Sequence, residues 1–135
     1  MNLSKSLWLK EDGFTLMEMM IVVAIIAILT AIALPKFNES LALANTARVQ
    51  ADLQSLDTAI AMYRVQNGSA PQAITDLDEY IDVDNVKAPT GDVYIDGVLT
   101  PNENNENYAL NSDKTNATFM GKTRVEFGKT TSAKP

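Results

Sequence analysis

The apolar residues of this chain gather in one run near its start. From Phe14 to Leu34 the sequence reads FTLMEMMIVVAIIAILTAIAL, 21 residues in which Glu18 is the only ionisable side chain. As a helix this run is about 30 Å long, which matches the hydrocarbon thickness of a bilayer. Because it is apolar on every face, it predicts a membrane-spanning helix. The alternative is a cleaved secretory signal with Ala31-Ile32-Ala33 as its cleavage site.

A short polar segment, 1–13, precedes this run, and no second apolar run follows it. Lys5 and Lys10 favour a cytoplasmic N-terminus under the positive-inside rule. We therefore expect a single-pass protein of the cytoplasmic membrane, oriented N-in and C-out.

Beyond Pro35 the pattern becomes amphipathic. Apolar positions recur at intervals of four, three, four and three residues, at Val49, Leu53, Leu56, Ile60 and Tyr63. This spacing predicts a helix with one face against a core. The stripe is too short to indicate a coiled coil. Asn67-Gly68 supplies a C-cap and Pro71 prevents continuation, so the helix is expected to run from residue 14 to 66.

The remaining residues predict short elements. Residues 75–82 are expected to form a short helix capped by Thr75, and 93–99 a hairpin with Asp96-Gly97 at a type I′ turn. Further strands are expected at 108–110, 117–120 and 122–127. The fold class is therefore α+β: a long N-terminal helix whose first half spans the membrane, packed against a small antiparallel sheet of three to five strands.

The predicted elements divide the chain into five parts. They are a leader (1–13), a membrane helix (14–35), an amphipathic helix serving as a spine (36–67), a loop plus antiparallel sheet (68–127) and a loose tail (128–135).

Composition removes most enzymatic functions. The chain has no His and no Cys, which excludes Ser-His-Asp and Cys-His nucleophiles, zinc sites with the usual ligands and disulfides. The formal net charge is -6, so the charge of the whole chain does not favour binding to nucleic acid. The alternative of a membrane-tethered enzyme would depend on carboxylates such as Asp76, Asp78 and Glu79 as its catalytic groups. A solvated first helical turn explains these residues better.

Glu18 requires an explanation, because an unpaired carboxylate one turn inside an apolar helix costs several kcal/mol or takes up a proton. It either snorkels to the headgroups or has a function. The stretch Gly13-Phe14-Thr15-Leu16-Met17-Glu18, followed at once by the apolar run, resembles the processing site of type IV prepilins and type II secretion pseudopilins. This resemblance covers residues 13 to about 35, with a looser likeness to major pseudopilins across 56–71.

The resemblance implies a set of roles for these residues. A prepilin peptidase would cut between Gly13 and Phe14, removing 13 of the 135 residues and leaving 122, and Phe14 would then be N-methylated. Glu18 would pair with the new ammonium of a neighbouring subunit, an attraction of about 4 kcal/mol at about 4 Å and an effective dielectric near 20. Helix packing in the filament is expected at the small residues Ala24, Ala27 and Ala31.

Pro35 removes a backbone donor and is expected to kink or loosen the helix. The resemblance adds that the helix melts there on filament formation; a simple kink at the membrane exit is the alternative. Two departures from the family stand out. Asp12 occupies a position that is often basic, and the C-terminal cysteine pair of many pilins is missing, which favours pseudopilins or pilins of other lineages.

The expected function is that of a structural, non-enzymatic subunit of a type IV pilus-type filament. Its partners would be identical subunits, the prepilin peptidase, a membrane platform protein, an assembly ATPase and the bilayer. The alternatives are a pseudopilin of a type II secretion or DNA-uptake system, and a minor pilin that binds DNA or a surface through Lys122, Arg124, Lys129 and Lys134.

No cofactor is expected. Asp92, Asp96 and Asp113, with Asn102 and Glu103 nearby, are candidate calcium ligands, but they match no known loop signature, and a solvated acidic surface explains them better.

Overall fold

The computed structural model describes residues 13–128. The predicted leader up to residue 12, the tail residues 129–135, and with them Lys5, Lys10, Asp12, Lys129 and Lys134, lie outside the described part. A helix of 52 residues, α1 (Leu16–Asn67), begins two residues after the predicted start and ends one residue after the predicted end. The chain divides into two units, one ending at Lys36 and the other beginning at Phe37.

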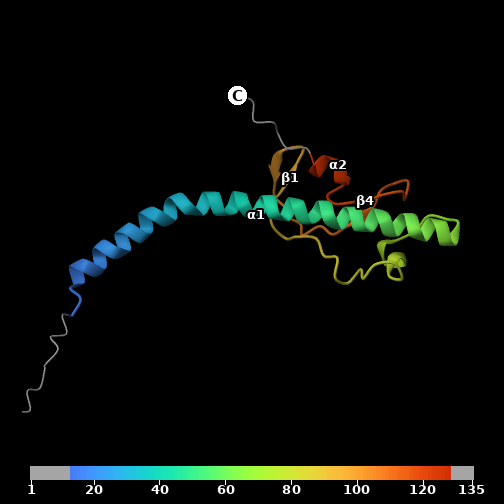
Figure 1. Ribbon diagram of the computed structural model, residues 1–135. Coiled ribbons are helices and arrows are strands. Elements are labelled where there is room, and N and C mark those ends of the chain that lie inside the picture. The colour runs from blue at the N-terminus through green and yellow to red at the C-terminus, as the bar shows by residue number, and fades with distance from the viewer. Residues whose placement is uncertain (1–12, 129–135) are drawn as a thin grey trace, which may run out of the picture. The chain divides into compact units, whose positions relative to one another are not determined.

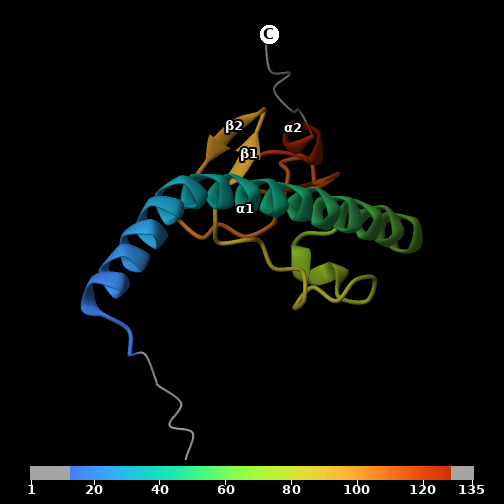
Figure 2. The same cartoon turned by 60° about the vertical axis from the view of Figure 1, so that its left-hand side comes forward.

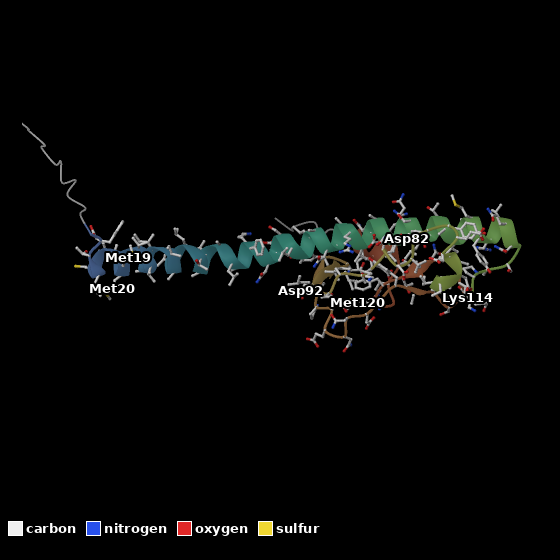
Figure 3. All side chains as sticks on the ribbon, turned by 90° about the horizontal axis from the view of Figure 1, so that it is seen from below. Met19, Met20, Asp82, Asp92, Lys114 and Met120 are labelled. Carbon is white, nitrogen blue, oxygen red and sulfur yellow. The ribbon has the colours of Figure 1, made fainter. Side chains whose placement is uncertain are left out.

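In the first unit, the described chain is the N-terminal part of α1. Every residue from 13 to 36 is exposed. Figure 3 shows Met19 and Met20 standing out from the helix into open surroundings. This is the one helix in the described part of the chain that is long and apolar enough to span a bilayer, and none of its apolar window is buried.

In the second unit, the rest of α1 carries the core. The predicted stripe is confirmed at Val49, Leu53, Leu56 and Ile60, which are fully buried, while Tyr63 is half-buried. They pack in one cluster with apolar side chains from the rest of the chain, including Leu77, Val93, Tyr108, Ala117, Phe119 and Phe127. Each large aliphatic side chain buried in this way stabilises the fold by about 1.5–3 kcal/mol.

The end of α1 follows the predicted cap. Gly68 takes the left-handed conformation (φ 66°), and its N–H donates to the Arg64 carbonyl at 2.9 Å. Only a residue without Cβ adopts this conformation freely, so Gly68 closes the helix. Pro71, three residues later, is fully buried.

The sheet is split into two pairs of strands. β1 (Val93–Ile95) and β2 (Val98–Thr100) form the predicted antiparallel hairpin, with Ile95 opposite Val98. Asp96 (φ 49°) and Gly97 (φ 77°) are both left-handed, as a type I′ turn requires. β3 (Ala109–Leu110) pairs with β4 (Ala117–Thr118) in a second antiparallel sheet. The α+β class is confirmed, but the strands form two separate pairs instead of one sheet.

The strand predicted at 122–127 is wrong. After a turn in which Met120 (φ 52°) and Gly121 (φ 71°) are left-handed, the chain forms the short helix α2 (Arg124–Phe127). The Glu126 carboxylate accepts hydrogen bonds from the Thr123 N–H at 2.6 Å and the Thr123 hydroxyl at 2.9 Å. These hydrogen bonds cap one helical turn and favour a helix over the strand that the alternating pattern predicted. Phe127 is buried in the helix, and Val125 is exposed.

The short helix predicted at 75–82 is confirmed only in part. It is a 3₁₀ helix, η1 (Ile74–Leu77), and its N-cap is Ala73, not Thr75. The Asp76 carboxylate accepts hydrogen bonds from the backbone N–H groups of Gln72 (2.7 Å) and Ala73 (3.1 Å), which places the N-cap two residues earlier than predicted. Leu77 is buried as predicted, and Tyr80 and Ile81 pack partly against the core. In both Figure 1 and Figure 2, this yellow-green segment lies on one side of α1, and β1 and α2 lie on the other.

Candidate assembly site

The candidate site is the start of α1, where Glu18 lies in the first turn. Glu18 Oε2 accepts two hydrogen bonds, from the Thr15 N–H at 2.9 Å and from the Thr15 hydroxyl at 3.1 Å. In return the Glu18 N–H donates to Thr15 Oγ1 at 3.1 Å, and the Thr15 carbonyl accepts from Met19 N–H at 3.2 Å. Thr15 and Glu18 therefore form a capping box at the N-terminus of the helix.

This box gives Glu18 a local role that sequence reasoning missed. The signal was present, because a Thr followed three residues later by Glu directly before an apolar run is the pattern of a capping box. Both hydrogen bonds reach Oε2, and Oε1 accepts none from residues 13–128. One oxygen of the carboxylate thus accepts hydrogen bonds from Thr15, while the other is left open to a cation.

The two residues at the predicted cleavage point lie next to this box. Phe14 is largely exposed, and a Cβ built on Gly13 would meet no atom within 4 Å. The backbone between them precedes the helix and has no regular secondary structure. The predicted cleavage point therefore lies outside the helix in an uncovered segment.

The small residues predicted for packing fall on the exposed helix surface. Ala24 and Ala27 line a shallow groove of about 420 Å³ together with Leu16, Met19, Met20 and Val23. Ala31 lies one turn further along and does not line it. Thr30, the polar residue within the run, donates its hydroxyl to the Ile26 carbonyl at 2.8 Å, so it places no unpaired donor on the apolar surface.

Pro35 lies inside α1, and the helix continues through it. It has no N–H to donate to the carbonyl of Ala31, one turn earlier. The helix is therefore intact at this point but lacks one of its backbone hydrogen bonds. The predicted melting of the helix stays a prediction.

The candidate calcium ligands are not brought together. Within residues 13–128, no three acidic side chains gather closely enough to hold a metal ion, and this includes Asp92, Asp96 and Asp113. Asn102 is buried and has a structural role: its amide donates to the Pro89 carbonyl at 2.8 Å, and its oxygen accepts from the Glu106 N–H at 2.9 Å. Calcium binding stays an untested prediction without a carboxylate cluster to support it.

The described part of the predicted basic patch is small. Lys122 lies 3.5 Å from Glu126 and is partly neutralised by it, while Arg124 is exposed. The Thr123 hydrogen bonds, and less strongly the Lys122 charge, hold the pKa of the Glu126 carboxyl below its usual value.

An exposed membrane-length helix that begins with a capped glutamate, joined to a small α+β unit, is the architecture of a pilin-like protein. Residues 8–34 match the family described as the prokaryotic N-terminal methylation motif. The predicted relationship to type IV pilins and type II secretion pseudopilins is confirmed by this match and by the relatives.

Three relatives show how far the similarity extends. The chain is 48% identical over 59 residues to fimbrial protein EcpB of Eikenella corrodens, covering 44% of this chain and 37% of that protein. It is 48% identical over 50 residues to the type IV major alpha-pilin of Moraxella bovis, covering 37% and 31%. It is 30% identical over 88 residues to type II secretion system core protein G of Aeromonas hydrophila, covering 65% and 61%.

The aligned part spans less than half the length of both fimbrial relatives. No solved structure matches the chain.

Proposed function

We propose that this protein is a structural subunit of a type IV pilus-type filament. It is cleaved between Gly13 and Phe14, methylated at Phe14 and polymerised through its N-terminal helix. The observation that carries this proposal is the exposed apolar helix headed by a single carboxylate, lying within the matched methylation motif.

Glu18 would act through its free oxygen. Cleavage leaves an ammonium on Phe14, and methylation preserves its charge. Because Thr15 already holds Oε2, the side chain is oriented before a partner arrives, and Oε1 is open to the ammonium of a neighbouring subunit. An attraction of about 4 kcal/mol at about 4 Å and a dielectric near 20 would set the axial register of helices that otherwise slide freely.

The rest of the chain takes its roles from this assembly. The leader 1–13 would be removed, 14–35 would form the membrane anchor and later the filament core, 36–67 the spine, and 68–127 the outer surface. Ala24, Ala27 and Ala31 would permit close helix packing, and Pro35 would be the point at which the helix melts on extraction from the bilayer. Before assembly the protein would lie N-in and C-out and meet the prepilin peptidase, a platform protein and an assembly ATPase.

A second candidate is a pseudopilin of a type II secretion or DNA-uptake system. The similarity to the core protein G extends over 88 residues, well beyond the apolar helix, and the chain contains no cysteine. Deleting the gene and measuring secretion, DNA uptake and surface filaments in the same strain separates these uses.

Two measurements test the subunit role. The mass of the protein recovered from membranes should correspond to a chain that starts at methylated Phe14; a chain that starts at Leu34 would show an ordinary secreted protein.

Variants of Glu18 then separate its charge from its cap. Glu18→Gln retains a side-chain oxygen for the capping box but removes the charge, whereas Glu18→Asp retains the charge on a shorter side chain. Loss of filaments in Glu18→Gln, with normal membrane insertion, supports the charge pair. Wild-type filament yield in Glu18→Gln would show that Glu18 only caps the helix. Glu103→Gln, which changes an exposed carboxylate elsewhere, is the control.

A further inference from the structure

Two apolar surfaces of the second unit are left uncovered. The first is a shallow groove of about 460 Å³ between α1 and the segment after η1, hereafter the spine groove. Met62, which is 50% exposed, forms part of its wall. Its other lining residues include Ala51, Ser55, Thr58, Tyr80 and Ile81.

The second surface is formed by β2 and α2. Val98, Leu99 and Val125 are 63%, 49% and 66% exposed, although they belong to regular elements next to the core. The Asp96 N–H donates to the Glu126 carbonyl at 2.8 Å, so the hairpin turn and α2 are held together. Val98, Leu99, Arg124 and Val125 are named the hairpin–α2 surface here.

The two surfaces carry opposite charge. Tyr80 and Ile81 line the spine groove, and the two residues before them, Asp78 and Glu79, are exposed acids. On the hairpin–α2 surface Arg124 is an exposed cation, because the acid of α2, Glu126, lies 3.5 Å from Lys122 instead. Arg124, Asp78 and Glu79 form no ion pair with any residue of the described chain. Complementary fields of this kind steer association and fix register.

We propose that the hairpin–α2 surface of one subunit docks in the spine groove of the next copy of the same chain. The segment after η1, which supplies Tyr80 and Ile81 to the groove, lies on one side of α1, and the hairpin and α2 lie on the other (Figures 1 and 2). A contact between two different patches is head-to-tail, so each copy leaves one patch free for another copy, and the contact repeats along an open filament. Val125 and Val98 would enter the groove while Arg124 faces Glu79. This interface rests on the proposed filament function and adds a contact between globular units.

Cysteine cross-linking tests the contact directly, because the chain has no native cysteine. Ser55 and Val125 are both exposed, so replacing them leaves the core intact. In filaments of the variant carrying both Ser55→Cys and Val125→Cys, oxidation should give a ladder of dimers, trimers and longer species on non-reducing gels. Each single variant should give no species larger than a dimer. The pair Ser55→Cys with Asp113→Cys, which places the second thiol on an exposed residue outside the surface, should give no ladder.

Charge reversal supplies the second measurement. Arg124→Glu and Glu79→Lys should each lower filament yield several-fold, and the double variant should restore it. Filaments that form normally without a 55–125 ladder would overturn the interface and leave the filament function standing. Failure of the unmodified chain to form filaments would overturn the filament function, and the interface with it.

Discussion

The phenol of Tyr108 donates a hydrogen bond to Asp52 at 2.7 Å, joining the start of β3 to α1 across 56 residues of sequence. Asp52 also lies 3.7 Å from Arg48, whose guanidinium donates to the Lys87 carbonyl at 2.9 Å. This chain of contacts fastens two distant loops to the spine helix. It is one of several polar attachments along the edge of the core.

Removing the phenol should weaken the fold. Tyr108→Phe keeps the ring packed against Phe119 (centroids 5.6 Å apart) but leaves the Asp52 carboxylate without a donor. Hydrogen bonds to charged groups contribute about 1.5–3 kcal/mol, so we expect a loss of about that size in the free energy of unfolding by urea. Tyr94→Phe is the control, because the Tyr94 hydroxyl forms no hydrogen bond within residues 13–128, and it should change stability by less than about 0.5 kcal/mol. Equal effects of the two variants would contradict the role of the Tyr108–Asp52 bond.

Tyr108 should also resist ionisation. Burial, and then the Asp52 hydrogen bond and charge, raise the pKa of Tyr108 far above its usual value of about 10. A group with a raised folded-state pKa contributes stability that is complete below the unfolded pKa and declines as pH rises above it. We therefore expect stability to fall above about pH 10, with a phenolate absorbance step that coincides with unfolding. That step should be missing in Tyr108→Phe, and a Tyr108 signal at lower pH in the folded protein would contradict the assignment.

Asp57 makes a comparable attachment to β4. One of its carboxylate oxygens accepts the N–H of Ala117 at 2.7 Å, and Ala117 is fully buried. Asp57→Ala leaves a buried backbone donor unsatisfied, which costs about 1–3 kcal/mol, whereas Asp57→Asn retains an acceptor and should cost less. Urea denaturation measures both, with Asp113→Ala as the surface control. If Asp57→Ala changed the free energy of unfolding no more than that control, the Asp57–Ala117 hydrogen bond would not stabilise the fold.

The sequence predicted the elements whose signal is local. The stripe of Val49, Leu53, Leu56 and Ile60, the Gly68 cap and the Asp96-Gly97 turn were all confirmed, because periodicity and left-handed turn chemistry depend on near neighbours. The strand predicted over 122–127 was wrong, because four alternating residues are too few to distinguish a strand from a capped helical turn.

The polar residues of α1 show the same limit of sequence reasoning. Thr46 accepts the Tyr94 N–H at 2.8 Å, while Asp52 and Asp57 receive Tyr108 and Ala117. In the sequence these residues appear only as the solvent-facing positions of an amphipathic helix. Their partners are 48 to 60 residues away, so no local pattern identifies them. At the candidate site, the motif identified the positions of Glu18 and Phe14. The Thr15–Glu18 box was missed, although its Thr-x-x-Glu spacing is present in the sequence.

Glu126 should make the fold sensitive to acid. Hydrogen bonds from Thr123 lower the pKa of its carboxyl, so its contribution is present above the unfolded value of about 4.5 and is lost as pH falls through the lowered folded value. Stability measured by thermal unfolding should therefore fall below about pH 4.5, and this part of the decline should be smaller in Glu126→Gln. Glu103→Gln serves as the matched control. An identical acid profile in Glu126→Gln and the wild type would rule out this contribution.

Substitutions of Gly121 measure the free-energy cost of a left-handed backbone conformation. Its φ is 71°, and a Cβ added there would meet no atom within 4 Å, so a side chain fits sterically but not conformationally. A left-handed residue with a Cβ costs about 1–2 kcal/mol, so Gly121→Ala should destabilise the protein by that amount. Gly121→Asn should cost less, because Asn tolerates this region better. Gly13→Ala, at an open position without left-handed φ, should leave unfolding by urea unchanged. If Ala and Asn at position 121 were equally harmless, the Met120-Gly121 turn would have to relax to another type, and the position of α2 after it would change.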